Sequence, residues 1–179
     1  MDSHLFALAP LGKTAHISFL VLFGVLGGLL LYLLLKPKPG TIRAVPATIL
    51  LAIMGFTGWL YWQANAAGLT LSAKTLDIRV PLYSQSIALT HLQVSQAKVI
   101  NGADEARPSL SLRTNGVGMP GYHLGWFRLD AGTKAFVAVS GVGDMLWIPT
   151  DLGYDLLLAP AEPQAVLQML QARFSAPAP

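Results

Sequence analysis

Three glycines, Gly116, Gly118 and Gly121, stand in the spacing Gly-x-Gly-x-x-Gly within the stretch NGVGMPGYHLGWF. In dinucleotide-binding proteins this spacing follows a strand and opens a helix, whose N-terminus meets the pyrophosphate. Here Pro120 occupies one of the x positions, and the following residues, YHLGWFRL, have the character of a strand. The context therefore favours glycines that allow positive φ angles and close approach between strands, rather than a nucleotide site.

The other reactive side chains form no recognisable catalytic or metal-binding pattern. The four histidines are scattered along the chain, and none belongs to a metal-ligand motif. Cysteine is absent, which excludes disulfides, thiolate ligands and a cysteine nucleophile. Serine, histidine and aspartate occur without a Gly-x-Ser-x-Gly turn or a similar nucleophile motif. We therefore expect a non-enzymatic protein that has no cofactor and no metal.

The distribution of charge argues against nucleic-acid binding. Residues 63–179 contain eight basic and eight acidic side chains, so the net charge of +3 arises in the first 62 residues. A surface that follows a phosphate backbone needs clustered lysine and arginine. No such cluster is visible, and we expect no nucleic-acid partner.

Two apolar segments predict membrane-spanning helices. Only 12% of the residues are charged and 53% are hydrophobic, whereas about a quarter are charged in a typical soluble domain. Residues 17–35 are uncharged and long enough to cross a hydrocarbon core about 30 Å thick. Residues 44–62 are less apolar but end in Trp59, Tyr61 and Trp62, as helices do at a membrane interface. Residues 1–16 are expected to be an N-terminal tail.

The short loop between these helices, residues 36–43, indicates the orientation in the membrane. Lys36, Lys38 and Arg43 give it three positive charges and no negative one. The positive-inside rule places such a loop in the cytoplasm. The N-terminus and the C-terminal domain would then be extracytoplasmic.

A small-residue motif, Gly24-x-x-x-Gly28, lies in the first helix. Such motifs allow close helix packing in membranes. We expect its partner to be the second helix, through Ala52 and Gly55, and a contact between two chains is the alternative.

The remainder of the chain predicts a small β domain. Short segments with alternating polar and apolar residues follow one another from LTLSA at residue 69 to YDLLLAP at residue 160, separated by turn residues. The last segment, AEPQAVLQMLQARF, has helical spacing of its apolar residues. About seven strands and one amphipathic helix predict a small barrel or bent sandwich closed by a helix, with residues 175–179 as a disordered tail.

The run LRTNGVGMPGYHLGWFRLDAGTKAFVAVSG, followed by LWIPTDLGYDLLLAPAEPQAVLQML, resembles the bacterial pleckstrin-homology-like domains. The resemblance implies a two-helix transmembrane hairpin followed by a PH-like antiparallel β-barrel or bent sandwich of about seven strands with a C-terminal capping helix, over residues 68–174. It implies little chemistry. Its most specific part is the family motif formed by Asn115, Gly116, Gly118, Gly121, Gly125, Trp126 and Phe127.

The expected function is that of a module at the bacterial inner membrane. Its partners would be the lipid bilayer and either another protein or further copies of itself. The alternative is a lipid-binding or lipid-transport accessory protein that uses an apolar barrel mouth. A phosphoinositide site of the PH type has poor support, because the corresponding loop offers Lys74 and Arg79 with Asp77 between them.

Overall fold

The computed structural model describes residues 4–36, 40–102, 108–130, 132–141 and 143–175, without the side chains of residues 40–43. The described residues form ten strands, three α-helices and two short 3-10 helices. In chain order these are β1 (His4–Ala7), α1 (Lys13–Leu35), α2 (Gly40–Asn65), β2 (Gly68–Leu71), β3 (Thr75–Arg79), β4 (Gln85–Ala88), η1 (Leu89–His91), η2 (Val94–Gln96), β5 (Lys98–Ile100), β6 (Leu110–Met119), β7 (Tyr122–Leu129), β8 (Lys134–Ser140), β9 (Met145–Ile148), β10 (Asp155–Leu158) and α3 (Pro163–Ser175).

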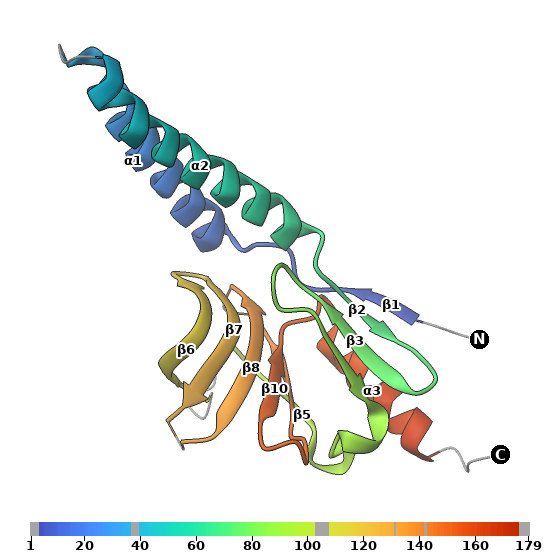
Figure 1. Ribbon diagram of the computed structural model, residues 1–179. Coiled ribbons are helices and arrows are strands. Elements are labelled where there is room, and N and C mark those ends of the chain that lie inside the picture. Colours follow the sequence, from blue (N-terminus) through green and yellow to red (C-terminus); the bar gives the residue numbers. More distant parts are fainter. Residues whose placement is uncertain (1–3, 37–39, 103–107, 131, 142, 176–179) are drawn as a thin grey trace.

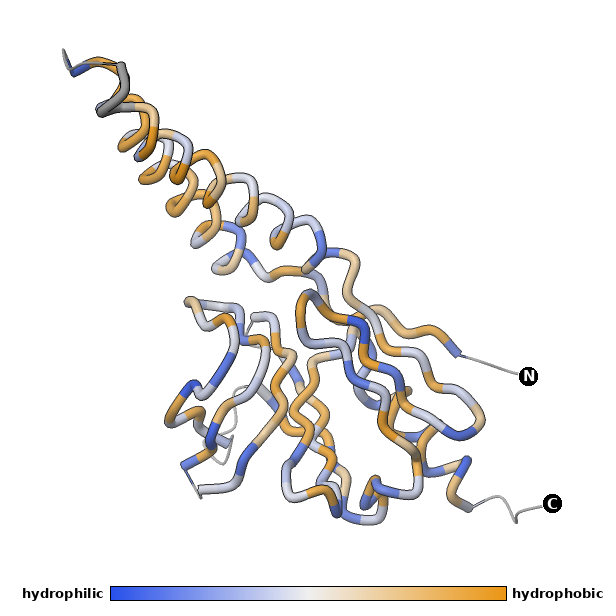
Figure 2. Tube along the Cα trace, viewed as in Figure 1, coloured by the Kyte–Doolittle hydropathy of each residue, from blue (hydrophilic) through white to orange (hydrophobic). Residues whose placement is uncertain are grey.

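Helices α1 and α2 form an antiparallel hairpin that projects from the sheets (Figure 1). Both are long and apolar enough to cross a membrane, over Lys13–Leu35 and Ala44–Asn65. Only 6% and 17% of the residues in their most apolar windows are buried, so neither is the core helix of a globular domain. Figure 2 shows the apolar residues spread along most of the hairpin. Both helices extend beyond the predicted segments, and Pro46 lies inside α2.

Of the residues expected to set the orientation, Lys36 lies at the distal end of this hairpin. Lys36 is exposed, and its ammonium group lies 4.6 Å from the centre of the Tyr32 ring. Lys38 and the side chain of Arg43 lie outside the described part of the chain. Because α2 begins at Gly40, the connection is shorter than the predicted loop of residues 36–43.

The small-residue motif of α1 does not pack against α2 as expected. A Cβ atom placed on Gly24, Gly28 or Gly55 would find no atom within 4 Å. The helices approach each other elsewhere: a Cβ atom placed on Gly58 would lie 3.6 Å from the ring of Phe23. The predicted contact through Ala52 and Gly55 is therefore wrong in this structure.

The strands form two sheets rather than one closed barrel. The smaller sheet has the order β1-β2-β3-β4, and the larger has the order β5-β9-β10-β8-β7-β6. All neighbours are antiparallel except β10 and β8, which are parallel. The prediction of about seven antiparallel strands is corrected in both number and direction, while the bent sandwich with a C-terminal helix is retained.

The N-terminal segment belongs to the sheet, although residues 1–16 were expected to be a tail. Strand β1 pairs with β2 along its full length, from His4 opposite Leu71 to Ala7 opposite Gly68. Beyond β1, the Leu8 amide donates to the Ala67 carbonyl, and the Ala9 amide donates to the Ala159 carbonyl. The segment therefore connects the smaller sheet to the end of β10 before α1 begins.

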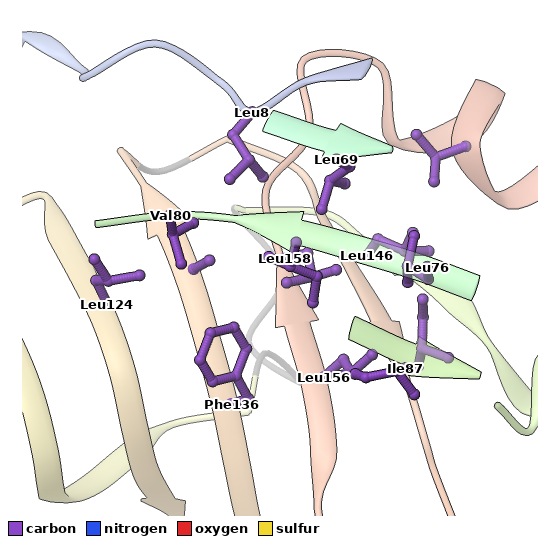
Figure 3. Packing of buried hydrophobic residues seen from close by; sticks show 14 of the residues in the cluster. Leu8, Leu69, Leu76, Val80, Ile87, Leu124, Phe136, Leu146, Leu156 and Leu158 are labelled. Atoms are coloured by element: carbon purple, nitrogen blue, oxygen red, sulfur yellow. The ribbon is translucent and has the colours of Figure 1, made fainter. Parts of the chain in front are cut away.

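The main hydrophobic core lies between the two sheets. Figure 3 shows Leu69, Leu76 and Ile87 of the smaller sheet facing Phe136 and Leu156 of the larger one. Leu8 of the N-terminal segment enters the same cluster. Strand β8 is buried on both sides, because Ala135, Val137 and Val139 contribute to a second cluster.

Helix α3 covers one end of this sandwich, against β5, β9 and η2. Val166 and Leu170 are one turn apart and both are buried. The Arg173 guanidinium donates to the Ser72 carbonyl at 2.6 Å, which joins the last turn of α3 to the connection between β2 and β3. Residues 176–179 of the predicted tail lie outside the described residues.

Candidate functional site

The glycine motif forms a β-hairpin instead of a loop that leads into a helix. Gly116 in β6 lies directly opposite Gly125 in β7, and Met119 opposite Tyr122 closes the hairpin. The backbones of Gly116 and Gly125 have φ angles of +155° and +115°. A Cβ atom on Gly125 would lie 2.5 Å from the Asn115 carbonyl oxygen and 2.7 Å from the Gly116 Cα. This close approach requires glycine on both strands.

The turn of this hairpin contacts the beginning of α1. Pro120 and Gly121 occupy the two turn positions, and Gly121 has a φ of +78°, as in a type II turn. A Cβ atom on Gly121 would lie 2.9 Å from the Ala15 backbone nitrogen and from the Thr14 Cβ. The Ser18 hydroxyl donates to the Pro120 carbonyl at 3.1 Å. The third glycine of the spacing therefore lets the domain lie directly against the helical hairpin.

A second turn of the larger sheet supports the same contact. The Gly141 amide donates to the Gly121 carbonyl at 2.8 Å, which joins the two turns. The Ser140 hydroxyl accepts from the Gly12 amide at 3.1 Å and donates to the Pro10 carbonyl at 3.2 Å. Gly141 is the first glycine of a second Gly-x-Gly spacing, in the stretch SGVGD. This glycine therefore lies beside the segment that leads into α1.

The apolar part of this junction is continuous with the core of the domain. Ala15 and Phe19 of α1 are fully buried and share one cluster with Leu124 of β7. The Phe19 ring lies 5.2 Å from that of Tyr61 in α2 and 6.3 Å from that of Tyr122 in β7. Burial raises the pKa of Tyr122 to about 12, because its ionised form would lose its hydration. The helices and the sheets therefore share one core at the base of the hairpin.

Asn115 of the family motif connects the larger sheet to the connection between β3 and β4. Its side-chain oxygen accepts a hydrogen bond from the Tyr83 hydroxyl at 2.9 Å. The same connection contains Leu82, which has a φ of +65° and is 55% exposed. The Tyr83 amide donates to the Pro81 carbonyl at 2.8 Å, so Leu82 is the centre of a γ-turn with positive φ. Such turns are rare and strained.

The remaining motif residues have packing roles. Trp126 contacts the rings of Phe136 and Tyr154, with centroid distances of 5.3 and 4.9 Å, and the Lys134 ammonium lies 4.3 Å from its ring centre. Phe127 is buried in the second cluster. A Cβ atom on Gly118 would make only ordinary contacts at 3.6 Å, so this position does not require glycine.

Hollows lie at three places among the described residues. One of about 540 Å³ lies between the end of α2 and the β3–β4 connection. One of about 340 Å³ lies between η2 and the end of α3. The third, at the base of the hairpin, has about 20 Å³, which is about the space that a single water molecule needs.

The described residues hold no group of three or more histidine, aspartate and glutamate side chains that could bind a metal ion. His91 Nδ1 and Asp151 Oδ1 are 2.8 Å apart, and both side chains are exposed. This pair lies next to the backbone bridge between Leu92 and Thr150. It therefore helps to join the segment that follows the smaller sheet to the segment that follows β9 of the larger sheet.

Several residues of the junction carried no recognisable pattern in the sequence. Tyr83, Thr14 and Ser140 lie in three separate parts of the chain. Only the fold brings Thr14 and Ser140 to the turns at Gly121 and Gly141, and Tyr83 to Asn115 in β6.

Comparison with known protein families agrees with this architecture. The family described as "Bacterial PH domain" matches residues 68–174, which is more than half of the chain. Comparisons with curated proteins and with solved structures give no significant match. The matched region begins at β2 and ends in the last turn of α3, so it covers both sheets apart from β1. The chain belongs to the bacterial PH domain family.

Proposed function

We propose that this protein is a membrane-anchored binding module. Its helical hairpin crosses the bacterial inner membrane, and its PH domain, held at the extracytoplasmic surface, binds another protein or further copies of itself. One observation carries this proposal: the apolar side chains of the hairpin are exposed along most of its length, whereas its base is built into the core of the domain. Exposed apolar area on this scale favours a bilayer as its surroundings.

The rigid connection supports a tethering mechanism. An anchored domain loses little translational freedom when it binds a partner in the same membrane, so weak contacts act at a high effective concentration. A domain that is also fixed in orientation presents the same surface to every partner.

The exposed edge of β6 supports the assignment of a protein partner. β6 ends the order of the larger sheet, and only β7 pairs with it among the described strands. It has ten residues, most of them exposed, including Leu112 at 59% exposure. An unpaired edge of this length suits addition of a strand from another chain.

The alternative, an acyl chain held in an apolar barrel mouth, has less support. The interior is filled by fully buried side chains such as Phe136 and Leu156. The hollow at the base of the hairpin, about 20 Å³, is far smaller than the volumes of roughly 300 Å³ or more that hold ligands.

Three measurements test the proposal. Extraction of membranes with alkaline carbonate should leave the full-length protein in the bilayer, and a periplasm-specific reporter fused after Pro179 should be active. A photo-crosslinking residue at Leu112, compared with one at the exposed Leu152, should give a specific crosslinked product in intact cells. Release by carbonate contradicts the anchor, a reporter active only in the cytoplasm contradicts the orientation, and equal crosslinking at both positions contradicts the β6 surface.

A further inference from the structure

The hollow of about 540 Å³ lies where α2 meets the domain, at the level at which α2 would leave a bilayer. Its walls are Trp59 and Gln63 of α2, Ala66 just after this helix, Arg79 at the end of β3, and Val80, Pro81, Leu82 and Ser84 of the β3–β4 connection. Figure 1 shows this connection rising from the smaller sheet toward the base of α2. Its volume of about 540 Å³ falls within the range of small-ligand sites.

The position of Trp59 gives the depth of this hollow. α2 contains 26 residues, which extend about 39 Å at 1.5 Å each, whereas the hydrocarbon core is about 30 Å thick. Several residues at its ends must therefore lie among the lipid headgroups. Trp59 is 39% exposed, and Trp62 is more exposed still. Tryptophan rings favour the boundary between hydrocarbon and headgroups.

The charge of the hollow is positive and uncompensated. Arg79 is exposed at the end of β3, and no acidic residue lines the hollow. Asp77, two residues earlier on the strand, accepts hydrogen bonds from the hydroxyls of Thr75 and Ser86. Within the described residues Arg79 has no carboxylate partner. Its guanidinium can therefore donate to an anion, and phosphate is the anion present at this depth.

Leu82 provides an apolar group on the rim of the same hollow. It lies in the strained γ-turn. Two hydrogen bonds hold this turn: the Tyr83 hydroxyl donates to the Asn115 side chain, and the Ser84 hydroxyl donates to the Val80 carbonyl at 3.0 Å. A strained conformation kept by several bonds around an exposed leucine indicates a functional role rather than a packing role.

We propose that this hollow binds the phosphate of an anionic phospholipid headgroup, with Arg79 as the cation and Leu82 in contact with the acyl region. The proposal rests on the membrane insertion proposed above. It differs from an acyl chain in the barrel interior, because the site lies outside the sheets, between α2 and the β3–β4 connection.

The test uses native mass spectrometry of the full-length protein released from bilayers that contain equal amounts of phosphatidylglycerol and phosphatidylcholine. The wild-type protein should retain phosphatidylglycerol in preference to phosphatidylcholine. Arg79→Gln should lower that preference by about tenfold, as expected for loss of a charge-assisted hydrogen bond. Arg128→Gln is the matched control, because Arg128 is exposed at the far end of β7.

A second variant separates binding from folding. Leu82→Asn removes the apolar side chain, and asparagine tolerates positive φ. It should lower lipid retention while the melting temperature stays the same or rises. A fall in melting temperature would make Leu82 a packing residue and overturn its assigned role.

Three further results would overturn the site. These are equal retention of both lipids by the wild-type protein, unchanged preference in Arg79→Gln, and displacement of the lipid by excess inorganic phosphate, which would make free phosphate the ligand. If carbonate extraction releases the wild-type protein, that result contradicts the proposed membrane anchor and not the lipid site alone. The two failures are therefore distinguishable.

Discussion

Replacing Gly125 by alanine should lower the thermal stability of the protein markedly. The new methyl group would lie 2.5 Å from the Asn115 carbonyl oxygen and 2.7 Å from the Gly116 Cα, and both are backbone atoms that cannot rotate away. The clash should cost about 1–3 kcal/mol, and the positive φ of Gly125 adds about 1–2 kcal/mol for a residue with a Cβ. Alanine recovers about 0.4–1 kcal/mol by restricting the unfolded chain. The net loss in the free energy of unfolding is about 3 kcal/mol.

Two other glycines separate the contributions to this loss. Gly132 also has a positive φ, +82°, but a Cβ there would meet no atom within 4 Å. Gly132→Ala should therefore cost about 1 kcal/mol or less, from the backbone conformation alone. Gly143 has open space and no positive φ in the left-handed region, so Gly143→Ala should leave stability unchanged or slightly raised.

The assay is thermal unfolding of the full-length protein in detergent, followed by the near-ultraviolet circular dichroism of its tryptophans. A chain of this size loses about 2–4 °C of melting temperature per kcal/mol. Gly125→Ala should therefore melt about 10 °C below the wild-type protein, and Gly132→Ala about 3 °C below it. If Gly125→Ala had the same melting temperature as Gly132→Ala, β6 and β7 would not approach each other closely at Gly125, and the explanation of the motif would be wrong.

Three further predictions concern the junction. Phe19→Ala should destabilise the whole protein by about 3–5 kcal/mol, because its ring is fully buried in the shared core, whereas Leu20→Ala, at a position 70% exposed, should not change the melting temperature in detergent. Since burial raises the pKa of Tyr122 to about 12, this residue should lower the free energy of unfolding of the wild-type protein by about 1.4 kcal/mol per pH unit between pH 10 and 12. Burial raises the pKa of Tyr154 as well, so Tyr122→Phe should show a smaller loss across that range than the wild-type protein. Tyr83→Phe and Asn115→Ala, combined in a double-mutant cycle of melting measurements, should couple by about 0.5–1.5 kcal/mol.

Each of these predictions has a result that contradicts it. Equal effects of the changes at Phe19 and Leu20 would mean that α1 does not share the core. The direction of the Tyr122 effect follows from its raised pKa: the unfolded chain ionises first, so stability is complete below pH 10 and is lost as the pH rises toward 12. Stability that does not fall in that range would mean that Tyr122 is exposed. Additive effects of the changes at Tyr83 and Asn115 would mean that no hydrogen bond couples the two side chains.

Elements with a strong local pattern could be predicted from the sequence. The two apolar helices, the amphipathic α3 and most strands of residues 68–174 follow from hydrophobic periodicity and turn residues, which are local properties. Strand β1 could not be predicted in this way. It has four residues, and its partner β2 lies beyond both helices of the hairpin, so the pairing that defines it is nonlocal. The insertion of β10 between β8 and β9, which makes one pair parallel, is also nonlocal.

The glycine motif shows the same limit at the level of single residues. The predicted positive φ angles occur at Gly116 and Gly121, and the predicted close approach between strands occurs at Gly116, whereas Gly118 shows neither. Spacing alone does not distinguish Gly116, which faces another backbone, from Gly118, which has ordinary room for a side chain. That difference depends on which residue lies across the strand pair.

The position of β1 affects how the anchor acts on the domain. β1 precedes α1 and pairs with β2, which follows α2, so the whole hairpin is an insertion between two paired neighbouring strands. The chain therefore leaves the sheet and returns to it at adjacent points, and the turns at Gly121 and Gly141 hold the first of these connections. A domain attached by one flexible linker could turn any face toward the bilayer. With both connections fixed, the β3–β4 connection stays beside the end of α2, and under the proposed function a partner in the same membrane would meet the edge of β6 in one orientation only.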